Sequence, residues 1–194
     1  LNLARVLVNG GGTSFKMDGN QLVLENLPEG HEPFDLEIFT TCNPDKNTQL
    51  MGLYVSQGTF FTQCEAEGFR RITYFLDRPD VMASYTVMLR ADKAKYPVLL
   101  SNGNCLDSGP LPADPVNGAE RHFAVWDDPF PKPSYLFALV AGQLEEVKDS
   151  FTTASGRAVA LRIHVEPGDA PYTAHAMASL KRSMAWDEQR YGLE

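Results

Sequence analysis

Apolar and polar residues alternate at every second position through most of the chain, and this period constrains the fold more than any other feature. Between Gly19 and Gly142, short apolar runs with this period are separated by turn residues. Residues 34–38 (Phe-Asp-Leu-Glu-Ile) are the cleanest example, because every second side chain of a strand points to the same face. The pattern predicts a mainly β chain, with one all-β domain of two packed or strongly curved sheets.

The strands of this domain can be placed approximately. Besides residues 34–38, strands are predicted at residues 22–24, 53–55, 85–89, 98–100, 122–126 and 135–140. Residues 1–8 are predicted as a strand already under way, with Asn9-Gly10 as a hairpin turn. The proline-rich residues 129–133 are interpreted as turn or edge structure, and residues 110–118 as an exposed loop.

The pattern changes after Gly142. A hairpin corner at residues 151–156 precedes alternation over residues 159–165, and a helix is predicted at residues 174–191. Its apolar stripe is formed by Met177, Leu180, Met184 and Tyr191. Thr173 is predicted as the N-cap and Gly192 as the C-terminal glycine. Two domains are therefore expected, residues 1–142 and residues 143–194, and the helix face around Met177 is expected to stay exposed unless a neighbouring molecule covers it.

Charge and cysteine content exclude several classes of function. The net charge of −8 argues against a nucleic-acid or phosphate-binding surface, which needs clustered Lys and Arg. It is compatible with an enzyme that accepts cationic groups, although acidity that favours solubility is the simpler interpretation. No membrane span or secretory leader is predicted. The odd number and wide spacing of Cys42, Cys64 and Cys105 fit neither a disulfide framework nor a zinc cradle, which favours a reducing cytoplasm.

Motifs for catalysis are missing from the chain. The four histidines include no pair spaced i, i+4. The only His-Glu pair, at residues 31–32, is followed by Pro33 and has Asp35 where a zinc-binding His-Glu-x-x-His helix needs its second histidine. Asp127-Asp128, beside a proline, is interpreted as a turn and not as a metal pair. No catalytic residue and no metal ligand is predicted in this chain.

Residues 62–71 concentrate charged and amide side chains directly after an apolar run. Glu65 can accept hydrogen bonds from an ammonium group, and Gln63 can add a neutral acceptor, a combination suited to a peptide amino terminus. Ion pairs of Glu65 or Glu67 with the two arginines that follow are the simpler interpretation. Cys64 is interpreted as a buried small residue, because no nearby histidine could activate it as a nucleophile.

Several uninterrupted blocks of the sequence resemble the bacterial aminopeptidase N family, a family of gluzincin metallo-aminopeptidases. The longest is residues 62–80, Thr-Gln-Cys-Glu-Ala-Glu-Gly-Phe-Arg-Arg-Ile-Thr-Tyr-Phe-Leu-Asp-Arg-Pro-Asp. Further blocks lie at residues 95–104, 128–133, 135–142 and 184–194. The resemblance runs over nearly the whole chain and is weakest in residues 1–50 and 110–119.

The resemblance implies a saddle-like antiparallel β domain, followed by the opening β-hairpin and helix of a truncated thermolysin-like catalytic domain. The parent would be a zinc aminopeptidase that removes N-terminal amino acids from peptides. Its zinc motif is expected beyond residue 194, so this chain alone is expected to be inactive and free of zinc. Glu65 matches the family's glutamate that meets the substrate's free α-amine, and Gln63 matches the glutamine that lines the pocket for the first side chain.

Partners follow from the same resemblance. They are peptides with a free N-terminus and the chain's own catalytic domain, with no nucleic acid and no membrane. One alternative is a non-catalytic saddle module that serves in protein–protein assembly, as in relatives that lack the zinc motif. A second is an unrelated β-sandwich for adhesion or carbohydrate binding, but its exposed aromatic row is not evident, and the helix at residues 174–191 would be unexplained.

Overall fold

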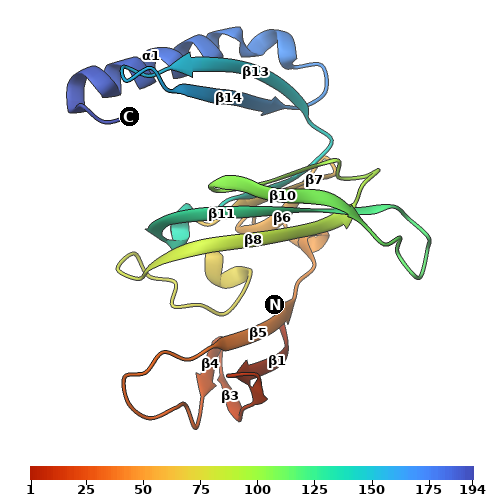
Figure 1. The fold of residues 1–194 in the computed structure, drawn as a ribbon. Coiled ribbons are helices and arrows are strands. Elements are labelled where there is room, and N and C mark those ends of the chain that lie inside the picture. The colour runs from red at the N-terminus through yellow and green to blue at the C-terminus, as the bar shows by residue number, and fades with distance from the viewer. The chain divides into compact units, whose positions relative to one another are not determined.

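A computed structural model describes all residues, 1–194, and divides the chain into two compact units, Leu1–Gly142 and Gln143–Glu194. The first unit contains β1 to β12 and three short 3₁₀ turns, and the second contains a β-hairpin, a fourth 3₁₀ turn and the single α-helix (Figure 1). Every strand pairing is antiparallel. The mainly β class with one C-terminal helix, predicted from the change of period, is confirmed.

The first unit begins with two small sheets. A three-stranded sheet has the order β2 (Gly11–Gly12), β1 (Asn2–Val8), β5 (Leu36–Thr41), and a separate hairpin joins β3 (Phe15–Asp18) to β4 (Gln21–Leu24). Asn9 and Gly10, with φ of 49° and 76°, form the predicted turn between β1 and β2. This geometry matches the right-handed twist of the strands, and Asn-Gly adopts it at low cost.

Two larger sheets form the rest of the unit. One has the order β6 (Gly52–Ser56), β7 (Thr59–Gln63), β12 (Leu139–Gly142), β9 (Val98–Ser101), and the other β10 (Asn104–Leu111), β11 (Arg121–Pro133), β8 (Met82–Asp92). Leu99, Ala124 and Ala141 form a buried cluster to which both sheets contribute, with Phe60 and Trp126 packed against it. Trp126 Nε1 also donates to the Leu99 carbonyl at 3.0 Å, so the indole satisfies its polar group inside this packing.

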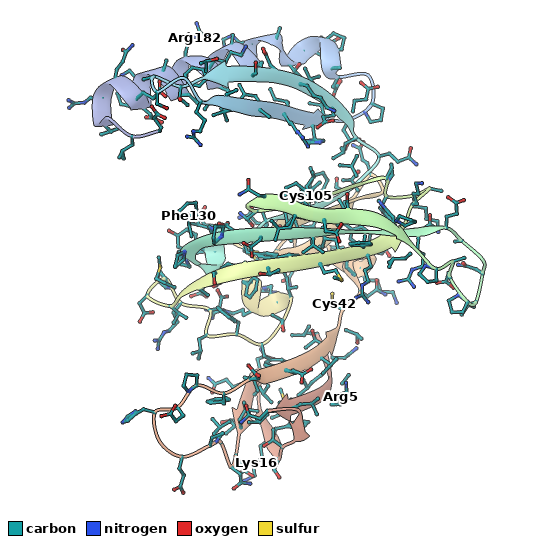
Figure 2. All side chains as sticks on the ribbon, in the orientation of Figure 1. Arg5, Lys16, Cys42, Cys105, Phe130 and Arg182 are labelled. Carbon is teal, nitrogen blue, oxygen red and sulfur yellow. The ribbon has the colours of Figure 1, made fainter.

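The interpretation of Asp127-Asp128 as a turn is wrong, and of the two interpretations of residues 129–133 the structure favours edge structure, because β11 pairs only with β8 beyond Asp127. Strand β11 continues to Pro133, with an irregularity between Asp128 and Lys132 that places extra residues opposite β8. A bulge of this kind accommodates prolines, which cannot donate to the ladder. Asp127 accepts a hydrogen bond from Thr86 Oγ1 at 2.7 Å, and Asp128 pairs with Lys132. Phe130, at the bulge, is 75% exposed (Figure 2).

Three further strand predictions need correction. The strand predicted at residues 34–38 begins two residues later than expected, because β5 spans Leu36–Thr41. Residues 135–140 were predicted as a strand, but a 3₁₀ turn (Ser134–Leu136) comes first and β12 begins only at Leu139. The predicted loop at residues 110–118 begins later than expected, because β10 runs to Leu111. Strand β10 is an edge strand, mostly exposed, and contains Gly109 and Pro110, so it lacks the alternation that marks a half-buried strand.

The second unit is a hairpin with a helix beside it. Strands β13 (Glu145–Thr152) and β14 (Ala158–Val165) pair along their whole length, and α1 (Ala174–Tyr191) lies along the hairpin (Figure 1). Lys181 Nζ lies 2.5 Å from Asp149 Oδ2 on β13, and Glu188 Oε1 accepts from the Ala154 backbone at 3.1 Å. These polar bonds attach the helix to the hairpin. The bounds of the helix, Ala174–Tyr191, are those predicted.

The helix ends and the apolar face of the helix agree with the prediction only in part. Gly192, with φ of 66°, ends the helix as expected. Thr173 precedes the helix but does not cap it, because its Oγ1 donates to the Ala170 carbonyl instead. The face of Met177, Leu180 and Met184 was expected to be open, which is wrong at Met177, 6% exposed, whereas Leu180 is 37% exposed. Met177 lies one turn before Lys181 and three turns before Glu188, on the side of the helix that is bonded to the hairpin.

Gly103, between β9 and β10, generates a prediction about the first unit. Its φ is +85°, and a Cβ atom there would lie 2.0 Å from the Asp127 carbonyl oxygen. Gly118 has a similar φ of +71° but open space around it. Gly118→Ala should cost about 1–2 kcal/mol of unfolding free energy through its backbone conformation alone. Gly103→Ala should cost clearly more in urea unfolding, and equal costs would contradict the close approach.

Candidate functional site

The charged segment identified in the sequence forms a tight turn at the end of β7. Gln63 is the last residue of the strand, and the Gly68 backbone nitrogen donates to the Cys64 carbonyl at 2.7 Å. Cys64 is 3% exposed, as predicted for a small buried residue, whereas Glu65 is exposed. Burial, with a further contribution from the nearby Asp77, raises the pKa of the Cys64 thiol to about 12. The thiol therefore stays protonated and is no nucleophile.

Gly68 allows the turn to close. A Cβ atom at this position would lie 2.1 Å from the Gln63 carbonyl oxygen and 2.8 Å from Cys64 Cα. Both are backbone atoms, which cannot move aside as the end of a flexible side chain can. The Gly68 backbone thus packs directly against the residues that lead into Glu65, and the Glu65–Ala66 peptide within the turn is cis.

A buried carboxylate, Asp77, holds the far end of the turn. Its Oδ2 accepts from both the backbone nitrogen and Nε of Arg70, each at 3.0 Å, and its own carbonyl accepts from Arg70 Nη2 at 2.7 Å. Its Oδ1 accepts from the Ser134 hydroxyl. Burial alone would raise the pKa of Asp77, but the bonds from Ser134 and Arg70 outweigh it and hold that pKa below its ordinary value.

An aromatic cluster lies next to this network. The Phe69 ring makes edge contacts with Phe75, Tyr85 and Phe137 at centroid distances of 5.1–6.1 Å. Burial, followed by the charge of Asp77, raises the pKa of Tyr85, whose hydroxyl is buried without a hydrogen-bond partner. Residue 69 immediately precedes Arg70, so these ring contacts fix the backbone beside the Asp77 bonds.

The two glutamates of the turn differ in their partners. Glu67 Oε2 lies 3.5 Å from Arg70 Nη1, and Arg71 donates to the Gln49 side chain at 2.6 Å. The Glu65 carboxylate makes neither an ion pair nor a hydrogen bond, and only its backbone carbonyl is engaged, by Gln63 Nε2 at 2.9 Å. The surface ion pairs considered from the sequence therefore form at Glu67 and not at Glu65.

An open hollow of about 330 Å³ lies beside the turn. It is lined by Glu65, Ala66, Glu67, Arg70, Asp77, Arg78, Pro79 and Tyr135. The structure thus places Glu65 on the hollow, whereas Gln63 does not line the hollow and its amide contacts the Glu65 backbone carbonyl. Sequence reasoning missed Asp77 and Ser134. Asp77 falls within the family-like block at residues 62–80, but nothing in the sequence links it to Ser134, 57 positions further on.

The residues of this chain do not fit a zinc site. No three His, Cys, Asp or Glu side chains come together as metal ligands would have to. Two of the four histidines contact groups that are distant in the sequence: His122 Nε2 lies 2.7 Å from the Tyr96 carbonyl oxygen, and His164 Nε2 lies 3.8 Å from Glu146 Oε1. No helix combines the length and the apolar character that crossing a membrane requires.

Comparison with known proteins assigns the family. Residues 12–136 match the Peptidase M1 N-terminal domain. This chain belongs to the peptidase M1 family. The match includes the whole turn that carries Glu65, together with Asp77 and Ser134.

Individual relatives agree with this assignment. Aminopeptidase N of Escherichia coli is 54% identical over 182 residues, which are 94% of this chain and 20% of that protein. The crystal structure of Legionella pneumophila aminopeptidase A in complex with aspartic acid is 36% identical, with a TM-score of 0.88, and matches all of this chain and 22% of that one. An M1 zinc metallopeptidase from Deinococcus radiodurans, 18% identical over 98% of this chain and 43% of its own, shares the fold with a TM-score of 0.76. The chain thus spans about a fifth of the length of its M1 relative from Escherichia coli.

The buried carboxylate predicts how stability depends on pH. The pKa of Asp77 is lower in the folded state, so its contribution is present above the unfolded value of about 3.9 and is lost as the pH falls through the folded-state pKa. Asp77→Asn should therefore cost about 1.5–3 kcal/mol of unfolding free energy at pH 6. The difference from the wild type should narrow towards pH 3, as measured by urea unfolding.

A surface pair provides the control for this measurement. Asp80 pairs with Arg78 at 3.1 Å, and both side chains are about two-thirds exposed. Asp80→Asn should change stability much less at either pH, because exposed ion pairs contribute little. A cost of Asp77→Asn that stayed the same from pH 6 to pH 3 would contradict the role of its charge.

Proposed function

We propose that this chain is the N-terminal part of a zinc aminopeptidase that removes amino acids from the free N-terminus of peptides. In this enzyme, the Glu65 carboxylate receives the substrate's α-ammonium group. The proposal is supported by membership of the peptidase M1 family and by the 54% identity to an aminopeptidase N. The single observation that carries the role of Glu65 is its unpaired carboxylate on the hollow, within a turn whose other charged side chains have partners.

The chemistry of an aminopeptidase explains why such a group is needed. The enzyme cleaves the peptide bond that follows the first residue, so it requires an anionic group that binds the α-ammonium at a set distance from the scissile bond. A carboxylate accepts strong charge-assisted hydrogen bonds from an ammonium group. It also discriminates against blocked or internal peptide bonds, because these carry no ammonium. A side chain held by a tight turn suits this task better than one on a mobile loop.

Gln63 contributes to the same pocket in the proposal. Its Nε2 donates to the Glu65 carbonyl, which orients the amide and leaves its Oε1 available as an acceptor. We assign it to the wall that contacts the first side chain of the substrate. The Gln63 amide is thereby coupled to the backbone of Glu65, from which the carboxylate extends.

The remaining parts of the enzyme follow from the family. Residues 1–142 are proposed to be its saddle-like β domain, and residues 143–194 the opening hairpin and helix of a thermolysin-like catalytic domain. The zinc is assigned to residues outside this chain, because no group of side chains here fits it. The three free cysteines, of which Cys42 and Cys105 are exposed (Figure 2), support a cytoplasmic, reducing location.

Substitution of Glu65 tests the proposal in the full-length enzyme that carries this chain. A charge-assisted contact is worth roughly 1.5–3 kcal/mol, so Glu65→Gln should lower kcat/KM on a free-amine substrate on the order of 10- to 100-fold. Zinc content should not change, because Glu65 is not a ligand. Steady-state kinetics on an aminoacyl anilide, with metal analysis of the same preparations, measure both quantities.

The matched control is Glu67→Gln, two residues away. Glu67 already pairs with Arg70, and its side chain is 71% exposed, so its loss should have a much smaller effect. Full efficiency in Glu65→Gln together with a loss in Glu67→Gln would move the role to Glu67. If neither variant were impaired, the amine would have to be received wholly outside residues 1–194. A full-length protein without any hydrolytic activity would favour the alternative role as an assembly module.

A separate prediction concerns the 194-residue chain alone. It should neither hydrolyse an alanine anilide nor retain stoichiometric zinc, because it has no two histidines spaced i, i+4 and no cluster of three possible metal ligands. Metal analysis after gel filtration and a sensitive anilide assay test this. One tightly held zinc per chain, accompanied by activity, would overturn the assignment of the zinc to residues elsewhere.

A further inference from the structure

The cation nearest in sequence to Glu65 that lines the same hollow is Arg70. A guanidinium presents five donors in a planar fork that matches a carboxylate. Glu65 and Arg70 would therefore be natural partners for each other, and an ion pair between them would occupy the carboxylate that we assign to the substrate. The structure contains no such pair.

The bonds between Asp77 and Arg70 explain why Arg70 does not pair with Glu65. The Asp77 carboxylate accepts from Nε of Arg70 and the Asp77 carbonyl oxygen from Nη2, at 3.0 and 2.7 Å, so two of the three guanidinium nitrogens are occupied. The Asp77 side chain is 3% exposed, whereas that of Arg70 is 46% exposed. The buried Asp77 thus holds the exposed Arg70, and the third guanidinium nitrogen, Nη1, lies 3.5 Å from Glu67 Oε2.

Asp77 is itself anchored from a second side. The hydroxyl of Ser134 donates to its Oδ1, and Ser134 is 1% exposed, the most buried side chain of the chain. Ser134 follows β11 and precedes β12, which pairs with β7 through Val140 and Phe61. The carboxylate that restrains Arg70 is therefore tied to the same sheet that carries the Glu65 turn.

We propose that Asp77 is a positioning residue for amine recognition: it sequesters Arg70 and holds the turn, so that Glu65 remains available to a substrate ammonium group. This inference rests on the proposed function of Glu65. It assigns no contact between Asp77 and the substrate. Without the Asp77 charge, Arg70 is released into the hollow and competes with the substrate for Glu65.

The test measures steady-state kinetics of the full-length enzyme on an aminoacyl anilide. Asp77→Asn should raise KM roughly ten-fold, as expected if competition removes much of one charge-assisted contact, with a smaller change in kcat. The double variant Arg70→Gln with Asp77→Asn should recover most of this loss, because the competing cation is gone. Asp114→Asn is the matched control, since Asp114 is also hydrogen-bonded but does not line the hollow.

A purely structural role gives a different result. In that case the double variant would be at least as impaired as Asp77→Asn, and this outcome overturns the inference. The variant Glu65→Gln with Asp77→Asn should be no worse than Glu65→Gln, because both changes act on one contact. If the two effects simply multiplied, Asp77 would act independently of Glu65 and the inference would be wrong.

The outcomes separate this inference from the proposed function. If Glu65→Gln is impaired and Asp77→Asn is not, only the positioning role of Asp77 fails. If Glu65→Gln has full efficiency, the proposed function fails and the inference fails with it.

Should Asp77→Asn lack a cooperative urea transition, Ser134→Ala replaces it, because this change removes one anchor and keeps the charge pair. Ser134→Ala should then raise KM about two- to five-fold, in line with the loss of one hydrogen bond, and an unchanged KM overturns the inference.

Discussion

The Asp77 carboxylate accepts hydrogen bonds from the backbone and guanidinium of Arg70 and from the hydroxyl of Ser134. Through these bonds one buried charge joins the turn after β7 to the segment between β11 and β12. Leaving such a charge without partners is far more costly than the pair itself is stabilising. The conformation of the turn therefore depends on Asp77, Arg70 and Ser134 all being present. The position of the exposed Glu65 depends in turn on that conformation.

The sequence predicts most of the fold because its signals are local. The Asn9-Gly10 turn, the strands with clear alternation and the helix at Ala174–Tyr191 each follow from a few neighbouring residues. The errors arise where distant structure overrides local preference. Asp127-Asp128 and the prolines after them are typical of a turn, but pairing with β8 keeps them in a bulged strand. Strand β10 lacks alternation because it is an exposed edge.

The residues of the candidate site also fall into those that the sequence can identify and those that it cannot. Glu65 and Gln63 could be selected from the chemistry of one short segment and from its resemblance to a family. Asp77 and Ser134 could not, because their pairing spans 57 positions and exists only after β11 and β12 have formed. Whether Glu65 or Glu67 pairs with the arginines also depended on the three-dimensional turn, since both lie within reach along the sequence.

In the proposed function, the β unit takes part in substrate selection and is not only a scaffold. We propose that a chain spanning 20% of the length of aminopeptidase N from Escherichia coli supplies a carboxylate for the amine, and that the metal chemistry belongs to the rest of the enzyme. The most direct measurement is a crystal structure of the full-length enzyme with a bound amino acid. The account predicts a Glu65 carboxylate oxygen about 2.7–3.2 Å from the α-nitrogen, with Arg70 still held by Asp77. An α-nitrogen bound only by residues beyond 194, with Glu65 out of hydrogen-bonding reach, would contradict it.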